Sequence, residues 1–211
     1  MAFKEYIRPV IALLRRISWK IIRLCKTVRH PVNADGRLLL HLGCGPIDVP
    51  GYTNVDTQPF PHVHYVHGVY PLEIFESNSV DLVYVSHVLE HFPFNEVPLV
   101  LKEWRRVLKD GGILRLGVPN FEVLTSIYAD TGDVGNILGP LMGGQSDRHN
   151  FHYSVFDGLY LTKLLQHAGF SEIRFWDPAL VENHDFHDTT SNVWNFLGKD
   201  YPISLNMEAV K

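Results

Sequence analysis

The sequence predicts an α/β fold in which helices cover a mostly parallel sheet. From Arg37 onward, short apolar runs typical of strands alternate with amphipathic stretches typical of helices. A glycine-rich turn, Gly43-Cys44-Gly45, directly follows the first apolar run, as at the carboxyl end of a central strand in open α/β sheets. The chain has 211 residues, of which 45% are hydrophobic and 20% charged, so we expect one domain with a sizeable core.

The first half of the domain is predicted to hold closely spaced strands and one helix. The expected strands are residues 38–42, 52–56, 62–66 and 80–86. The expected helix spans 95–108 because its apolar residues recur on one side. We expect Gly111-Gly112 to stop that helix.

The second half is predicted to complete the sheet. A fifth strand is expected at 113–118, ended by Pro119-Asn120. A further helix is expected at 157–168, with Gly169 as its stop. The remaining strands are expected at 173–176 and 203–210.

The N-terminal segment differs in charge from the rest of the chain. Residues 1–30 carry a net charge of +7 and the remainder −11. We therefore divide the chain into a basic amphipathic helix (1–30), a linker (31–36) and one folded domain (37–211). The acidic domain offers no electrostatic footprint for nucleic acid.

The predicted N-terminal helix separates apolar from basic side chains over residues 3–29. Such a helix lies on an anionic membrane surface or packs on protein, either a partner or the chain's own domain. Basic residues interrupt every apolar run, so neither a membrane span nor a signal peptide is predicted. The only cysteines, Cys25 and Cys44, lie in different contexts. A disulfide framework is not expected, so a cytoplasmic protein fits best. If the N-terminal helix meets lipid rather than protein, the chain would be peripheral on the inner face of a membrane.

The glycine-rich turn predicts a ligand site. Gly43 and Gly45 allow a ligand to approach the main chain closely. Asp56, at the end of the next expected strand, can accept hydrogen bonds from both hydroxyls of a ribose. A nicotinamide site needs a third glycine where Asp48 stands and an acid about 20 residues on. A phosphate-free, cationic ligand therefore suits the turn better.

Several motifs in order resemble the class I S-adenosylmethionine-dependent methyltransferases, within them the small bacterial type 11 branch. The matching stretches are 41–46 (HLGCGP), 50–56 (PGYTNVD), 79–92 (SVDLVYVSHVLEHF), 101–112 (LKEWRRVLKDGG) and 161–170. The resemblance spans about residues 37–211. It implies a Rossmann-like sheet of seven strands in the order 3-2-1-4-5-7-6, the last antiparallel, with helices on both faces.

The resemblance also implies S-adenosyl-L-methionine as cofactor and assigns residues to its site. Gly43, Cys44 and Gly45 would line its methionine and ribose part and Asp56 the ribose hydroxyls. Ser86 and His87 would line its edge at the fourth strand. His41 stands where the family has an acid that contacts the amino group, and Gly68 near an adenine-contacting Asp. These residues form the expected cofactor site: His41, Gly43, Cys44, Gly45, Asp56, Gly68, Ser86 and His87.

Three histidines are candidates for a general base. His149 and His152 fall in the segment where this family places acceptor-binding residues, and His91 could also face the methyl group. Imidazole is well suited to proton removal near neutral pH. Structural roles remain the alternative for all three. The chain contains 12 histidines, some at ligand-like spacing, but no Cys partners or HExxH motif accompany them. We predict no metal site.

Two functions follow from the sequence. The first is transfer of a methyl group from S-adenosylmethionine to a small-molecule or glycan acceptor, such as a hydroxyl of a sugar or polysaccharide precursor; that acceptor class rests on the family resemblance. The second is a noncatalytic module that keeps the fold and binds a partner, which the departures at His41 and Gly68 favour. The sequence makes no prediction of the oligomeric state.

Overall fold

The computed structural model of the chain describes residues 13–14, 17–18, 21, 31, 35–146 and 149–211. Most of the predicted N-terminal helix and of the 31–36 linker therefore lies outside the described residues. Those described between 13 and 21 are helical, and the apolar ones are exposed. No helix in the described ranges could cross a bilayer.

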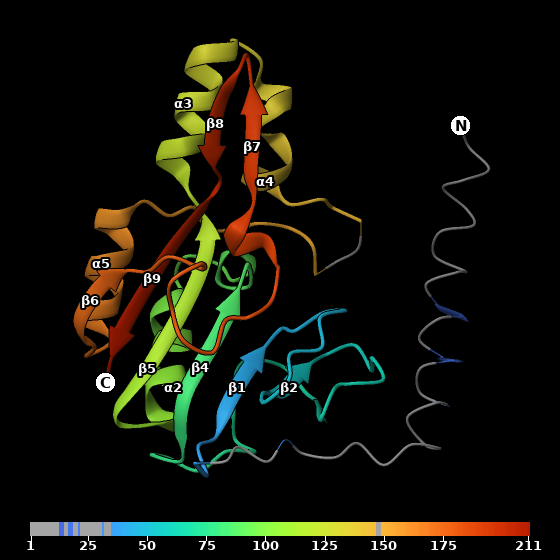
Figure 1. Cartoon of the computed structure of the whole chain (residues 1–211), viewed down its shortest axis with the longest axis vertical. Coiled ribbons are helices and arrows are strands. Elements are labelled where there is room, and N and C mark those ends of the chain that lie inside the picture. The colour runs from blue at the N-terminus through green and yellow to red at the C-terminus, as the bar shows by residue number, and fades with distance from the viewer. Residues whose placement is uncertain (1–12, 15–16, 19–20, 22–30, 32–34, 147–148) are drawn as a thin grey trace.

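A seven-stranded sheet organises the domain (Figure 1). Its strands, in spatial order, are β3 (Tyr65–Val66), β2 (Thr53–Asp56), β1 (Leu39–Leu42), β4 (Val80–Ser86), β5 (Leu108–Pro119), β9 (Ser204–Val210) and β6 (Ser171–Phe175). Neighbours from β3 to β5 are parallel, and β9 is antiparallel to both β5 and β6. Because β9 is the seventh strand of this sheet along the chain, the predicted order 3-2-1-4-5-7-6 is confirmed.

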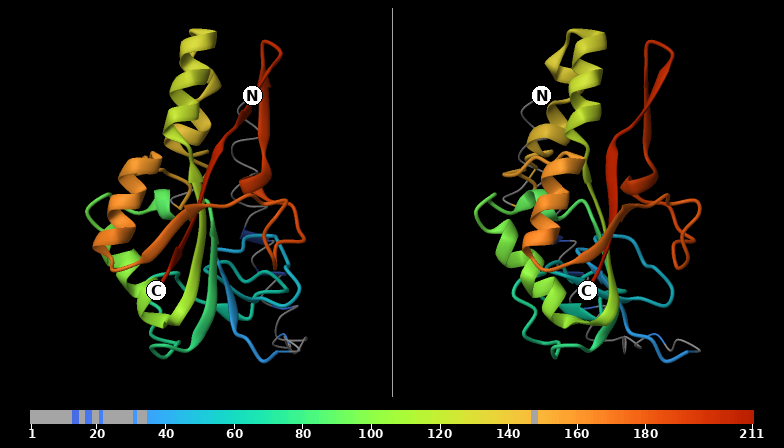
Figure 2. Two further views of the ribbon diagram at one scale, coloured as in Figure 1. Left: turned by 60° about the vertical axis from the view of Figure 1, so that its left-hand side comes forward. Right: turned by 90° about the vertical axis from the view of Figure 1, so that its left-hand side faces the viewer.

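Helices cover one face of the sheet. Helices α2 (Val97–Val107) and α5 (Gly158–His167) lie on the same side of it in both views of Figure 2. The apolar side of α2 is wholly buried, including Trp104, whose indole donates to the Val69 carbonyl at 2.9 Å. The prediction of a helix packed through this side is confirmed.

The other face departs from the prediction of helices on both faces. Within the described residues it is covered by the segment 177–192, whose only helix is the short 3-10 helix η3 (Thr189–Ser191) and whose Phe186 packs beside Tyr52 and Tyr84 (Figure 2). Only residues 43–52 join β1 to β2. That is too short for the turns and crossover helix of a βαβ unit. The chain therefore covers this face with a later segment.

The junction between α2 and β5 also differs from the sequence prediction. Helix α2 ends at Val107, because Leu108 is already extended (ψ 143°) and pairs with Val80. Gly111 and Gly112 consequently lie inside β5 rather than stopping the helix.

A projection that the sequence did not predict stands beyond the carboxyl ends of the strands (Figure 1). It consists of α3 (Phe121–Thr131), α4 (Leu138–Met142) and the hairpin of β7 (Val193–Phe196) and β8 (Lys199–Pro202). Its small core holds Leu124, Ile127, Ile137, Tyr201 and Ile203. The sequence does carry signals for both ends of α3, since Asn120 caps its start and Gly132 ends it in a left-handed conformation. It carries no such signal for the hairpin, because the turn is Leu197-Gly198 rather than one of the common turn pairs.

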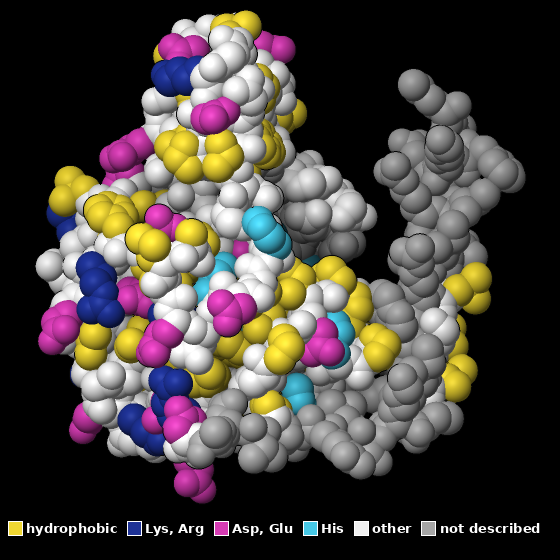
Figure 3. Space-filling view, viewed as in Figure 1, with side chains coloured by type: hydrophobic (Ala, Val, Ile, Leu, Met, Phe, Trp, Pro, Cys, Tyr) yellow, Lys and Arg dark blue, Asp and Glu magenta, His cyan; other side chains and the backbone are white. Residues whose placement is uncertain are grey.

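The described surface shows no broad basic patch on the face of Figure 3, where Asp and Glu side chains are scattered among Lys and Arg. This agrees with the acidic balance of residues 31–211.

Candidate active site

A cavity of about 380 Å³ opens at the carboxyl ends of β1, β2 and β4. Its lining residues come from the loops that follow these strands and from the segment after α4. They are Gly43, Asp56, Thr57, Gln58, Gly68, Val69, Tyr70, His87, Val88, His91, Phe92 and His149. The volume falls within the range of small-ligand sites.

Gly43 keeps the main chain close to the cavity. Its φ is +66°, and a Cβ at this position would lie 2.5 Å from Cγ2 of Val88. Its N–H donates to the Val55 carbonyl at 2.8 Å, which fixes the turn against β2. Any larger residue here would displace Val88 from the cavity wall.

Asp56 is held in place by main-chain donors. Gly45 N–H donates to Oδ2 at 2.8 Å and Gln58 N–H to Oδ1 at 2.6 Å. The residue is only 8% exposed, yet it lines the cavity. Each carboxylate oxygen keeps a further lone pair, so Asp56 can accept hydrogen bonds from two ligand hydroxyls.

The structure separates the other predicted cofactor residues into two groups. Gly68 and His87 line the cavity, and Gly45 reaches it through its hydrogen bond to Asp56. His41, Cys44 and Ser86 do not line it.

Those three residues have other surroundings. His41 is 1% exposed and lies among Tyr52, Tyr84 and Phe186, where burial lowers its pKa to about 4. Cys44 packs with Phe60 and Val63, and burial raises the pKa of its thiol well above the usual range. The Ser86 hydroxyl interacts with Asp188 on the Tyr84 side of β4, away from the cavity lining.

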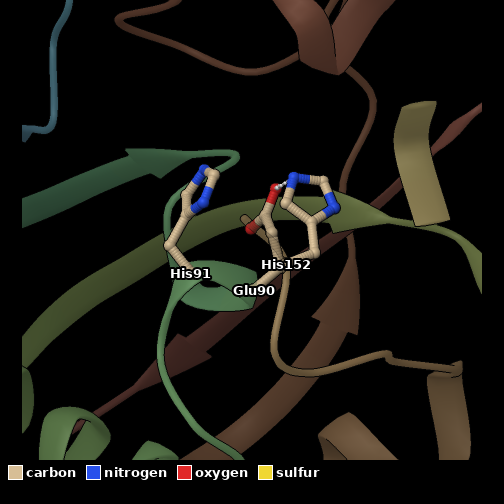
Figure 4. Close-up of side chains that lie close together, drawn as sticks. All are labelled: Glu90, His91 and His152. Atoms are coloured by element: carbon tan, nitrogen blue, oxygen red, sulfur yellow. Dashed lines mark ion pairs between the residues drawn. The ribbon is translucent and has the colours of Figure 1, made fainter. Parts of the chain in front are cut away.

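Four ionisable side chains gather at one wall of the cavity. Glu90 is fully buried, and its Oε1 lies 3.2 Å from Nδ1 of His87 and 4.0 Å from Nε2 of His152. The rings of His91 and His152 are 4.8 Å apart, centroid to centroid. Figure 4 shows Glu90 between the two histidines. Burial alone would raise the pKa of Glu90, but the nearby His87 and His91 outweigh it, so its pKa lies below the ordinary value.

Hydrogen bonds fix how two of these imidazoles are oriented. His91 donates from Nδ1 to the Phe151 carbonyl at 3.0 Å, and His152 donates from Nδ1 to the Pro140 carbonyl at 2.8 Å. When neutral, each ring therefore keeps its lone pair on Nε2. Burial lowers the pKa of His152, partly offset by the charge of Glu90, which favours the neutral ring.

The three predicted base candidates thus come together without being equivalent. His91 and His149 line the cavity, whereas His152 lies behind His91 against Glu90. Glu90 itself was missed by sequence reasoning. The available signal was a carboxylate inside the apolar stretch Val88-Leu89-Glu90-His91-Phe92, one helical turn after His87.

Residues 53–116 match the model of the type 11 methyltransferase family, described as a methyltransferase domain. The match runs from β2 through β5, the strands whose ends carry Asp56 and His87. The observed strand order is the one that the resemblance to the class I methyltransferases implies. The match and the fold together support a S-adenosylmethionine-dependent methyltransferase.

Solved structures share the fold of this methyltransferase. A S-adenosylmethionine-dependent methyltransferase from Archaeoglobus fulgidus has 16% identity and a TM-score of 0.52, over 83% of this chain and 86% of that one. A possible histamine N-methyltransferase from Thermotoga maritima has 15% identity and a TM-score of 0.51, over 99% of each chain. A complex of the Trm112 methyltransferase activator with a putative methyltransferase, from Haloferax volcanii, gives 16% identity and a TM-score of 0.51, over 86% and 85%. A comparison with curated protein sequences found no match.

The cofactor of the methyltransferase is S-adenosylmethionine, and the cavity suits it. Gly43 leaves space that a Cβ would fill, and Asp56 is already oriented by two N–H donors. Among the described residues that line it, the cavity presents a carboxylate and no Lys or Arg, which matches a ligand that carries a sulfonium and no phosphate.

Proposed function

We propose that the methyltransferase transfers the methyl group to a hydroxyl of a small molecule or glycan precursor. The observation that carries this proposal is that His91 and His87 line the same cavity as Gly43 and Asp56. S-adenosylmethionine supplies an activated methyl group on a sulfonium. The protein therefore needs chiefly to align donor and acceptor and to remove one proton.

We assign a separate role in cofactor binding to each of several cavity residues. Asp56 accepts hydrogen bonds from the ribose hydroxyls, and Gly43 lets the main chain approach the methionine part. Gly68 and Tyr70 line the same cavity, and we assign them to the adenine of the cofactor. His87, at the end of β4, borders the methyl group.

His91 is the best placed of the three candidate bases. It lines the cavity, and its donation from Nδ1 to the Phe151 carbonyl leaves Nε2 able to accept a proton. His149 is the second choice, because it lines the same cavity from the segment after α4. His152 is the third, because its Nε2 faces Glu90.

We further propose that the N-terminal segment holds the enzyme on the anionic inner surface of a membrane. Leu13, Leu14, Ile17 and Ile21 are between 46% and 59% exposed. Eight Lys or Arg residues lie within the first 30 positions. An exposed apolar stripe with many cations nearby suits the headgroup region of an anionic bilayer.

Calorimetric titration with S-adenosylhomocysteine tests the cofactor site. We expect the full chain to bind it and Asp56→Ala to bind at least about 10-fold more weakly, since two charge-assisted hydrogen bonds are lost. NAD serves as the control and should not bind. If S-adenosylhomocysteine does not bind, the noncatalytic partner-binding module is favoured instead.

A further inference from the structure

We propose that Glu90, His91 and His152 bind a divalent first-row transition-metal ion in the wall of the cofactor cavity. The sequence predicted no metal, so this proposal departs from it. Two imidazoles and one carboxylate form a ligand set that such ions commonly take, with positions left open for a substrate or water.

The geometry brings one ligand atom of each residue within reach of a single ion. These atoms all lie within 4.8 Å of one another. Two atoms that each lie about 2.1 Å from a tetrahedral ion are about 3.4 Å apart. Small side-chain rotations that draw the atoms together by up to about 1.5 Å would complete the site. Figure 4 shows that the three side chains already converge.

The surroundings of the Glu90 carboxylate independently indicate that a cation binds here. Its side chain is fully buried, and neither carboxylate oxygen has a hydrogen-bond partner in the described part of the chain. Nδ1 of His87 is 3.2 Å from Oε1 but lies off hydrogen-bond geometry. A buried carboxylate without hydrogen bonds is costly unless it is paired or coordinates a cation.

Both histidines are held as metal ligands usually are. Each donates its Nδ1 proton to a main-chain carbonyl, of Phe151 for His91 and of Pro140 for His152. This second hydrogen bond fixes the tautomer and turns the lone pair of Nε2 outward for coordination. Both histidines are therefore oriented beside a buried carboxylate that accepts no hydrogen bond in the described part of the chain.

His87 favours a cation here as well. The Ser204 hydroxyl donates to the Thr189 carbonyl, so it accepts from Nε2 of His87 at 2.6 Å. A neutral His87 therefore turns the lone pair of Nδ1 toward Oε1 of Glu90. A cation bound to Glu90 would offset this repulsion by neutralising the carboxylate charge. The competing arrangement is a protonated His87 paired with Glu90 and no metal.

The ion would serve the proposed methyl transfer by holding the acceptor oxygen, and this role rests on that proposed function. A metal-bound hydroxyl loses its proton more easily. Because the ion would occupy Nε2 of His91, the proton would pass to His149, the second-choice base, or to water. The oxygen then attacks the methyl carbon, the carbon–sulfur bond breaks, and its electron pair stays on sulfur. Because His91 lines the cavity, an ion on its Nε2 would border the place where the acceptor lies.

Titration of metal-free full-length protein with Co²⁺, followed by visible absorption, tests the site. We expect one equivalent to bind, with a spectrum that Zn²⁺ abolishes by competition. Glu90→Gln and His152→Gln should each weaken binding by more than about 100-fold, since loss of a second-shell partner alone costs 10- to 100-fold. His167→Gln, at an exposed histidine on α5, is the matched control and should bind as the wild type does.

The outcome is separable from that of the proposed function. S-adenosylhomocysteine calorimetry on the same variants shows whether each is folded and keeps its cofactor site, without metal. Co²⁺ binding that is absent in the wild type, or equal in the wild type and both ligand variants, would overturn the metal site and leave the protonated His87 pair. Lack of S-adenosylhomocysteine binding would instead count against the proposed function, whatever Co²⁺ does.

Discussion

At the scale of the residue, His41 shows how burial changes a side chain's chemistry. It lies on β1, two positions before Gly43, but its ring packs with Tyr84 on the side of the sheet away from the cavity. Its Nδ1 is buried without a hydrogen-bond partner among the described residues. His41 is therefore a neutral ring within an aromatic cluster. Because it does not line the cavity, the lack of the family's acidic residue at this position does not alter the cavity lining.

This environment predicts a pH dependence of stability. Burial lowers the pKa of His41 from 6.5 to about 4, so between these values the unfolded state binds more protons than the folded one. Stability should therefore fall as the pH is lowered from 6.5 to 4, by about 3 kcal/mol from this residue. In urea unfolding measured across this range, His41→Leu should show a shallower decline than the wild type. Equal slopes would contradict this account.

At the scale of the element, a buried ion pair links three adjacent strands. Arg115 on β5 and Arg174 on β6 both pair with Glu208 on β9, at 2.6 and 2.8 Å. These positions are register neighbours across the strands. Arg115 also donates to the Glu182 carbonyl and lies over the Trp176 ring, so it ties the 177–192 segment to the sheet.

Removing the shared carboxylate should destabilise this side of the sheet. Glu208→Gln leaves the buried Arg115 charge uncompensated, and we expect a loss of about 3 kcal/mol in the free energy of unfolding. Chemical denaturation measures it. The matched control is Asp130→Asn, which removes the exposed pair with Lys199 and should have a much smaller effect, since exposed pairs contribute little. Equal losses in the two variants would refute the assigned role of burial.

At the scale of the whole molecule, charge divides the chain into a basic beginning and an acidic remainder. An anionic bilayer would attract the first and repel the second. The division therefore predicts both attachment and orientation, with the acidic domain held away from the lipid.

Sedimentation with vesicles checks the attachment. The full chain should sediment with anionic vesicles and far less with neutral ones, and added salt should reduce its recovery because it screens the cations. A variant with Arg8, Arg15, Arg16, Lys20 and Arg23 changed to Glu should remain in the supernatant while still binding S-adenosylhomocysteine. Equal recovery of both proteins with anionic vesicles would instead indicate that the segment packs on protein.

Much of the fold could be predicted because it depends on local pattern. The buried runs of β1 and β4, the apolar side of α2, and Asp157 as the cap of α5 are each visible within a short window of sequence. The β7–β8 hairpin was not predictable, because its strands alternate only weakly and become apolar partners through contact with α3. Residues 177–192 likewise gain their covering role only from the face that they happen to meet.

The candidate site likewise has residues that could be predicted from the sequence and residues that could not. Gly43, Gly45 and Asp56 were predictable because a strand end and a turn determine where they lie, within 14 residues of one another. The grouping of Glu90 and His91 with His152 was not predictable, because some 60 residues separate them. They come together only because the loop after α4 packs against η1 (Leu89–His91). The sequence by itself determined the alternation of strands and helices, the cofactor turn and the charge division, and its resemblance to the family implied the strand order. Tertiary structure alone decided which histidines face the cavity, and it turned Glu90 into a buried carboxylate without hydrogen bonds, since burial and orientation depend on distant segments.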